Sequence, residues 1–251
     1  MNERTAPPAI RLRDVVAAET TKIITHPASI YTLLLALMLN LAFAIIDAAG
    51  VMFSVHADQP PATLSDFGAV MFFPIYVFLV IPVIAASSEY KDGQFRLTLA
   101  TVPNRKRLMY GKWIAMVMSI LLAFLIAVLP ARVILGMTDG LHAGSILADL
   151  GRWMVVYVLM SCIAYGLAGY WRNAIAPLAI LVFIPVVIAT GVLMQWPQLL
   201  RFLPDQAAMS VLGAPAYEMT RLPVPIALLA LTGWAVVCLL AYGLALLRRD
   251  S

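Results

Sequence analysis

The chain has 251 residues, of which 63% are hydrophobic and only 12% are charged. Soluble domains are close to half apolar and one quarter charged, and disordered chains combine low hydrophobicity with high net charge, so this composition excludes both classes. The two cysteines, Cys162 and Cys238, lie within apolar runs and do not make a disulfide scaffold. The net charge of +4 comes from basic residues at the ends of apolar segments, which argues against a nucleic-acid-binding module.

Six segments are apolar and long enough to cross a bilayer as helices, which takes about 20 residues each. They are residues 29–48, 67–87, 108–129, 153–170, 174–194 and 225–247. Their charged side chains are Asp47 and Lys112, each near a segment end. No segment shows the alternation of barrel strands, so the sequence predicts an all-α polytopic membrane protein with a single transmembrane domain over residues 1–251. The first run is longer than a signal-peptide core, and we expect it to be retained.

The basic residues predict the orientation of these spans. With six spans, both termini share one side of the membrane with the loops after spans two and four. That side holds 13 of the 17 basic residues, namely Arg4, Arg11, Arg13, Lys22, Lys91, Arg96, Arg105, Lys106, Arg107, Lys112, Arg172, Arg248 and Arg249. The other side holds Arg132, Arg152, Arg201 and Arg221. Because cytoplasmic loops carry the excess of Lys and Arg, both termini are predicted to be cytoplasmic.

Residues 10–25 are predicted to form an amphipathic helix ahead of the first span. Leu12, Val15, Val16 and Ile23 fall on one side of that helix, as in helices that lie in the membrane interface. Pro27 then turns the chain into the bilayer. A plain orientation anchor is the alternative interpretation of this segment.

The loop between spans two and three, residues 88–107, is more apolar than a solvated connector needs to be. Its charged residues alternate with Tyr90, Phe95, Leu97, Leu99 and Val102. Pro103 suits the start of a helix, so a short helix before it and a new helix running into span three are expected. We expect another surface to cover this loop. The alternative is that Arg105, Lys106 and Arg107 only anchor the orientation.

The outer segment of residues 195–224 is too apolar to lie in water and too interrupted by proline to span. Short re-entrant or interfacial helices are therefore predicted there. The spans themselves contain prolines that predict kinks in spans two and five, at Pro74, Pro82, Pro177 and Pro185.

Catalytic motifs are absent from the sequence. It contains no phosphate-binding Gly-x-x-x-x-Gly-Lys loop, no His-Glu-x-x-His and no Gly-x-Ser-x-Gly, and its three histidines are scattered, so no catalytic residue and no metal site are predicted. Asn40, in the middle of span one, can hydrogen-bond between helices or line a path. Asp47 and Arg132 are expected at a similar depth near the outer face, where they can pair or simply reach the interface.

The order of these motifs resembles the type-2 ATP-binding-cassette (ABC) export permeases. That family carries Glu-Tyr-basic-x-Gly-Thr-aliphatic-Arg after span two, then Thr-Leu, Pro-x-x-Arg and a Lys opening span three. The chain has Glu89-Tyr90-Lys91-Asp92-Gly93-Gln94-Phe95-Arg96-Leu97-Thr98-Leu99, then Val102-Pro103-Asn104-Arg105 and Lys112, with Gln94 and Phe95 as departures. Glu19 and Lys22 look like the family's Glu-x-x-Lys elbow helix, and Trp171-Arg172-Asn173 and Arg248-Arg249-Asp250 look like its loop after span four and its C-terminal ending.

The resemblance implies a non-catalytic permease subunit of the bacterial plasma membrane. It implies pairing with a second permease, the same or homologous, and with two copies of an ABC ATPase subunit that binds ATP and Mg, while this chain binds no cofactor. Residues 90–101 are then a coupling helix that docks on the ATPase, and the residues implied in coupling are Glu89, Tyr90, Gly93, Phe95, Arg96, Leu99, Pro103, Arg105 and Arg107. The outer segment 195–224 becomes an extracellular gate, and the candidate gate or pathway residues are Asn40, Asp47, Arg132, Phe202 and Leu203.

The implied activity is efflux of an antibiotic, a drug, or a hydrophobic or antimicrobial peptide. A secondary transporter and an intramembrane enzyme are the alternatives. The enzyme would need a facing nucleophile and base or a metal set within the spans, and the transporter would show buried ionisable groups near the midplane or inverted halves. Neither pattern is evident in the spans of this sequence.

Overall fold

The structure, a computed structural model, describes residues 10–53, 62–90, 98, 104–215 and 217–248. These residues are almost entirely helical, and the one β-type pairing among them is an isolated bridge between Phe53 and Ala62. The all-α prediction is therefore confirmed. The longer helices are α1 (Leu12–Thr25), α2 (Pro27–Ala48), α7 (Arg105–Ala127), α8 (Leu129–Thr138), α9 (Ala143–Trp171), α10 (Ile175–Ala189) and α13 (Val224–Arg248). The shorter ones are η1 (Leu64–Asp66), α3 (Gly68–Phe72), α4 (Pro74–Phe78), α5 (Val80–Ser87), η2 (Ser88–Tyr90), η3 (Val192–Gln195), α11 (Pro197–Leu200), α12 (Pro204–Leu212) and η4 (Glu218–Thr220).

Five helical segments of the described chain are long and apolar enough to cross a membrane. They are Pro27–Ala48, Gly68–Tyr90, Arg105–Ala127, Ala143–Trp171 and Val224–Arg248, and they correspond to five of the six predicted spans. The remaining predicted span, residues 174–194, is α10, which has 15 residues and is followed by a turn at Gly191. At 1.5 Å per residue, a helix of this length is shorter than a hydrocarbon core of about 30 Å. The multi-pass membrane character is thus supported, while the count of six spans stays a prediction.

The second span is built from short helices because proline interrupts it. α3 ends at Phe72, α4 begins at Pro74, and α5 begins at Val80 with Pro82 in its first turn. A proline lacks the N–H that a continuous helix needs and its ring crowds the preceding turn, which agrees with the kinks predicted for this segment. The third span ends in a similar way, since α7 stops at Ala127 and α8, with Pro130 in its first turn, continues to Thr138.

The packing of α9 against α13 depends on glycine. A Cβ atom at Gly166 would lie 2.5 Å from the backbone carbon of Cys238, and one at Gly169 would lie 2.5 Å from the ring of Tyr242. Small residues at such contacts let two membrane helices approach closely. Further along α9, the buried ring of Tyr157 packs edge-on against Phe78 of α4 at 4.9 Å and against Phe124 of α7 at 5.5 Å. These contacts make α9 the centre of the core.

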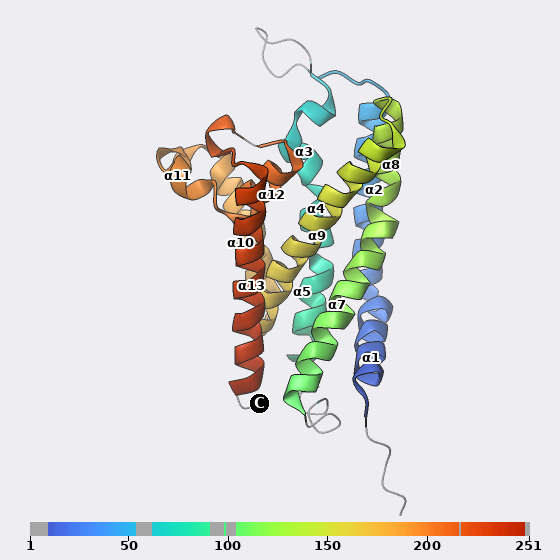
Figure 1. The fold of residues 1–251 in the computed structure, drawn as a ribbon, viewed down its shortest axis with the longest axis vertical. Helices are drawn as coiled ribbons and strands as arrows, with labels where there is room; N and C mark the ends of the chain where they lie inside the picture. The colour runs from blue at the N-terminus through green and yellow to red at the C-terminus, as the bar shows by residue number, and fades with distance from the viewer. Residues whose placement is uncertain (1–9, 54–61, 91–97, 99–103, 216, 249–251) are drawn as a thin grey trace, which may run out of the picture.

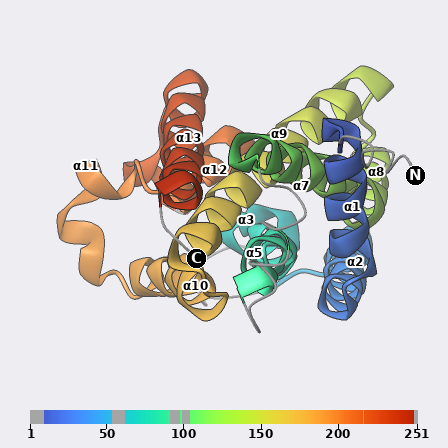
Figure 2. The same ribbon diagram turned by 90° about the horizontal axis from the view of Figure 1, so that it is seen from below.

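The two ends of the helix bundle differ in what they carry (Figure 1). α1, η2, the start of α7 and the C-terminal end of α13 lie at one end, which we call the α1 end. α8, α11 and α12 lie toward the other, which we call the α12 end. Seen from below, α2 and α8 form one flank, α10 and α11 form the other, and α5, α7 and α9 lie between them (Figure 2). The beginning and the end of the described chain therefore share one end of the bundle, in agreement with an arrangement that places both termini on one side.

The amphipathic helix predicted over residues 10–25 is present as α1, but its apolar side faces protein. Val15 and Ile23 are 4% and 8% exposed. A Cβ atom added to Gly111 of α7 would lie 2.5 Å from Cγ1 of Val15, so the two helices are in close contact. Val15 and Ile23 of the predicted apolar stripe are therefore covered by protein, and Val15 meets α7 at Gly111, whereas Leu12 of the same stripe is 39% exposed.

Candidate functional site

Four charged side chains from three elements meet at the α1 end. Glu19 and Lys22 come from α1, Glu89 from η2, and Lys112 from α7. The Lys22 Nζ lies 2.8 Å from Oε1 of Glu19 and 2.7 Å from Oε1 of Glu89. The Lys112 Nζ lies 2.9 Å from Oε2 of Glu19 and 2.7 Å from Oε2 of Glu89. Each of the carboxylate oxygens thus faces one ammonium group, and the residues form a closed ring of alternating charge that we call the ion network.

The ion network is largely removed from solvent. The side chains of Lys112, Glu19 and Glu89 are 3%, 7% and 7% exposed, whereas that of Lys22 is 49% exposed. Burying an ion costs several kcal/mol, and the cost is offset only when its partners are well placed. The formal charges of two lysines and two glutamates cancel. Removing any one buried member would leave a charge without its partner, so the network ties the three elements to one another.

Lys22 is the member of the ion network that reaches solvent. Partial burial alone would lower its pKa, but its hydrogen bonds to Glu19 and Glu89 and their negative charges outweigh that effect and raise the pKa above the usual 10.5. The ammonium form of Lys22 is therefore the form that the folded protein stabilises.

The local sequence explains why these side chains can meet. Glu19 and Lys22 are three residues apart and lie on the same side of α1. Gly111 precedes Lys112, and its lack of a side chain lets Val15 of α1 approach the α7 backbone. Glu89 lies at the end of the second apolar segment, next to the start of the undescribed loop residues. The Glu-x-x-Lys pattern and the close helix contact together place both carboxylates against Lys112.

Tyr90 connects η2 to α9 and α13 at the α1 end. Its hydroxyl donates to the Tyr242 hydroxyl at 3.5 Å, and the Arg172 guanidinium lies 5.2 Å from the centre of its ring. Tyr242 in turn packs edge-on against Tyr165 at 5.5 Å between ring centres. Glu89 and Tyr90 are consecutive, so η2 contacts α1 and α7 through one residue, and the ends of α9 and α13 through the next.

The end of the loop that leads into α7 is also held by hydrogen bonds. Asn104 caps α7 by accepting from the Arg107 backbone N–H at 3.0 Å. The Arg105 guanidinium donates to the Leu246 carbonyl at 3.3 Å near the end of α13, and the Arg107 guanidinium donates to the Ile10 carbonyl at 2.6 Å. Both flanks of residues 91–103 are therefore attached to the bundle. The other predicted coupling residues lie outside the described residues, namely Gly93, Phe95, Arg96, Leu99 and Pro103.

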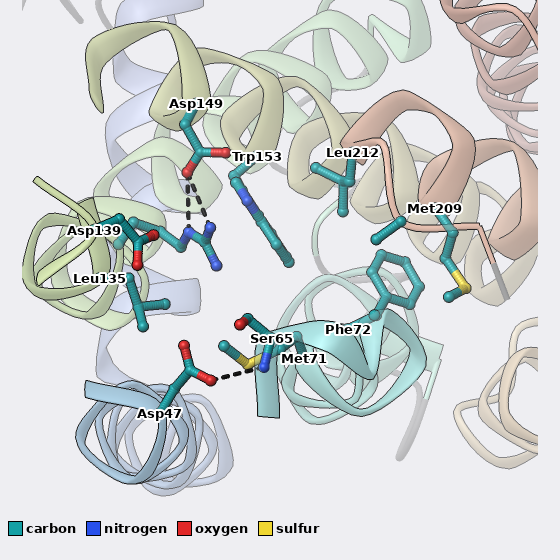
Figure 3. Close-up of a pocket in the computed structure, with 13 residues that line it drawn as sticks. Asp47, Ser65, Met71, Phe72, Leu135, Asp139, Asp149, Trp153, Met209 and Leu212 are labelled. Carbon is teal, nitrogen blue, oxygen red and sulfur yellow. Dashed lines mark hydrogen bonds and ion pairs between the residues drawn. The ribbon is translucent and has the colours of Figure 1, made fainter. Parts of the chain in front are cut away.

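At the α12 end, Asp47 and Arg132 line the same cavity of about 170 Å³, shown in Figure 3. Of the two alternatives left open for them, pairing or reaching the interface, the structure does not show pairing with each other. Arg132 pairs with Asp149 at 3.0 Å and its guanidinium lies 4.4 Å from the centre of the Trp153 ring, while Asp47 accepts from the Ser65 backbone N–H at 2.7 Å. The reason is that α9 begins at Ala143, ten residues before the predicted span, and its extra turns carry Asp149 to Arg132.

The other predicted pathway residues are not brought into this cavity. Asn40 is buried, and its side-chain amide donates to the Ala36 carbonyl of its own helix at 2.8 Å. The Phe202 carbonyl accepts from the Trp234 indole N–H at 2.9 Å. Leu203 precedes α12 and lines a different cavity. The structure therefore joins only Asp47 and Arg132 of this predicted set in one cavity.

Some contributing residues were missed by sequence reasoning. Lys112 was counted among the charged residues of the spans and as the residue that opens span three, but no partner was predicted for it, although a lysine within an apolar run indicates that a carboxylate is close. The contacts of Tyr165, Tyr242 and Asp149 join segments that are distant in the sequence, and no local sequence pattern predicts them. Asp205, at the start of α12, was not predicted as a site residue, because the proline-rich segment that contains it was interpreted from its apolar content alone.

No protein-family model matches this sequence, and no curated protein matches it either. In the part of the chain that the structure describes, no group of three or more His, Cys, Asp or Glu side chains is placed to hold a metal ion. Function is therefore inferred from the ion network, the loop that begins beside it and the cavities at the α12 end.

Proposed function

We propose that the chain is the membrane-spanning subunit of an ATP-driven exporter of the type-2 ABC class, coupled to a separate ATPase. The observation that carries this proposal is the ion network of Glu19, Lys22, Glu89 and Lys112. It lies beside the start of the loop expected to dock on the motor. A loop that only connects two spans needs no buried charges at its base, whereas a loop that transmits force needs rigid attachment at both flanks.

The contacts at the α1 end support a defined route for that force. A motor that displaces residues 91–103 pulls on η2 on one side and on α7 on the other. The ion network joins both to α1, which leads directly into α2. Packed interfaces switch between discrete arrangements rather than deform continuously, so the elbow and the first two spans move as one body. ATP drives this change because the motor's two states hold the loop in different positions.

In the complete assembly, two copies of the ATPase, each with ATP and Mg, lie beneath two permeases, the same or homologous. Both termini and the α1 end face the bacterial cytoplasm. The region of α10, η3 and α11 completes the sixth crossing together with re-entrant outer helices. The cargo is an antibiotic, a drug, or a hydrophobic or antimicrobial peptide.

The proposal is tested by purifying the affinity-tagged chain from membranes of its native host. The wild-type chain should retain a polypeptide that hydrolyses ATP. Phe95→Asp and Leu99→Asp each place a charge on the proposed docking surface, and we expect either change to reduce the recovered ATPase activity at least tenfold with unchanged membrane insertion. Met137→Asp is the matched control, because Met137 is 71% exposed at the opposite end of the bundle. Equal recovery of ATPase activity with all variants would refute docking at this loop.

A secondary transporter is the second candidate, and the observation that favours it is the buried carboxylate of Asp205, which is 4% exposed. Such a transporter couples cargo movement to an ion gradient through ionisable groups of this kind. The two functions are distinguished by measuring the uptake of a candidate cargo into inverted membrane vesicles. Export requires ATP and survives an uncoupler of the proton gradient, whereas secondary transport has the opposite dependence.

A further inference from the structure

Asp205 occupies an unusual place at the α12 end. It is the second residue of α12, directly after Pro204, and it is 4% exposed. Its carboxylate accepts from the Gln206 side-chain amide at 3.0 Å, and it has no lysine, arginine or histidine partner among the residues that the structure describes. Burial raises the pKa of Asp205, although hydrogen bonds from Gln206 act in the opposite direction. A buried carboxylate of this kind is costly unless a positive charge can approach it.

The helix that carries Asp205 is firmly held. The Gln206 carbonyl oxygen Oε1 accepts from the Thr220 hydroxyl at 2.9 Å, and the Ser210 hydroxyl accepts from the Leu222 backbone N–H at 3.2 Å. These bonds fasten α12 to the segment that leads into α13, beside which it lies in Figure 1. A carboxylate near the N-terminal end of a helix is stabilised by the helix dipole, so Asp205 also suits its position in α12. That role requires neither burial nor adjoining cavities.

Two cavities adjoin Asp205 and share it as a lining residue. One, of about 290 Å³, is lined by aromatic side chains including Phe72, Phe73, Tyr76 and Tyr217. The other, of about 210 Å³, includes Trp171 and Trp234. Pro185 of α10 also lines both. The larger cavity is close to the lower end of the range of about 300–1,000 Å³ that is typical of sites for drug-sized ligands.

We infer that Asp205 and these two cavities form a binding site for a hydrophobic organic cation. Asp205 supplies the negative charge, and the aromatic rings on either side supply apolar surface and cation–π contacts. A neutral ligand would add no opposite charge to the hydrogen bond that Asp205 accepts from Gln206, and an anion would be repelled by the carboxylate. The inference rests on the proposed function only in making such a cation the exported cargo, because binding itself needs no motor.

The test is equilibrium binding to the purified full-length chain, with tetraphenylphosphonium as the probe and tetraphenylborate as its counterpart of like shape and opposite charge. Saturable binding is measured as the part of the bound probe that excess unlabelled tetraphenylphosphonium displaces. We expect saturable binding of the phosphonium and none of the borate. Asp205→Asn should weaken phosphonium binding at least tenfold, while Asp14→Asn, a change on α1 at the opposite end of the bundle, should leave it unchanged.

A second variant keeps the test valid if Asp205→Asn does not fold. Val182→Trp fills the larger cavity and leaves Asp205 in place, and Val237→Trp puts the same side chain on α13, where it lines neither cavity. Only Val182→Trp should weaken phosphonium binding. Binding that is equal for both tryptophan variants, or equal for the phosphonium and the borate, overturns the inference. Because ATPase recovery is measured separately, failure here leaves the coupling proposal intact.

Discussion

The two ends of the bundle use charge in opposite ways. At the α1 end, two lysines and two glutamates close a ring in which every carboxylate oxygen faces an ammonium group. At the α12 end, Arg132 pairs with Asp149 only, while Asp47 and Asp139 line the same cavity without a basic partner of their own in the described chain (Figure 3). A closed ring has no charge left for a ligand and is suited to joining elements. A cavity with unmatched carboxylates is suited to contact with something outside the chain.

The largest effect is expected from Lys112→Met, which breaks the ring at its most buried cation. Glu19 and Glu89 would then share only Lys22, and the loss of one partner from a buried ion cluster costs about 3–5 kcal/mol. The free energy of unfolding, measured by denaturant titration in lipid–detergent micelles, should fall by that amount. Lys106→Met is the matched control, since Lys106 is exposed on the same helix. A loss no greater than that of the control would contradict a structural role for the ring.

A second way to break the α1 end is to push α1 away from α7. Gly111→Ala places a methyl group 2.5 Å from Cγ1 of Val15, and overpacking of this kind costs about 1–3 kcal/mol. Combining it with Val15→Ala should restore part of the loss. Gly151→Ala is the control, because nothing lies within 4 Å of a Cβ atom there. If both alanine variants unfold at the same temperature, the close contact between α1 and α7 is not present in the protein.

The equivalent change at the α12 end breaks the ion pair of Arg132 and Asp149. Asp149→Asn removes the partner of Arg132, but these side chains are 33% and 18% exposed, and the contact of Arg132 with Trp153 remains. The expected loss is about 1 kcal/mol, because solvent screens this pair more than it screens the ring. The same titration should therefore separate Asp149→Asn clearly from Lys112→Met. Equal losses would mean that the two ends do not differ as described.

The smallest effect concerns pH. The raised pKa of Lys22 contributes stability that is fully present below its unfolded value of about 10.4 and is lost as the pH rises through the folded value. The unfolding temperature of the wild type should consequently fall more steeply above about pH 10 than that of Lys22→Met. Lys106→Met should retain the wild-type slope. Parallel slopes for wild type and Lys22→Met would show that Lys22 gains nothing from the ring.

The sequence predicted the parts of this architecture that depend on composition and spacing. Apolar length predicted the five helical segments that are long and apolar enough to cross a membrane, and the position of Pro74 marked a break between short helices. The Glu19 and Lys22 pair was named through the resemblance to a Glu-x-x-Lys elbow helix, a pattern that lies within one short segment of the sequence. Their meeting with Glu89 and Lys112 could not be predicted, since it depends on how α1 packs against Gly111 of a distant helix.

The α12 end was less predictable for a related reason. The predicted fourth span begins at residue 153, whereas α9 already begins at Ala143, and its first turns bring Asp149 to Arg132. Asp205 looked like one polar residue in a proline-rich connector, and only the three-dimensional structure places it between two cavities. Helix length and burial are set by tertiary contacts, which a single sequence does not display.

Docking of an ATPase on the loop after the second span is tested by photocrosslinking from position 95 in intact membranes. A photoreactive amino acid replacing Phe95 should attach the chain to an ATP-hydrolysing polypeptide, and the same group at position 137, at the other end of the bundle, should not. Crosslinking from position 137 alone, or labelling of position 95 by a reagent confined to the outer side of the membrane, would contradict the account.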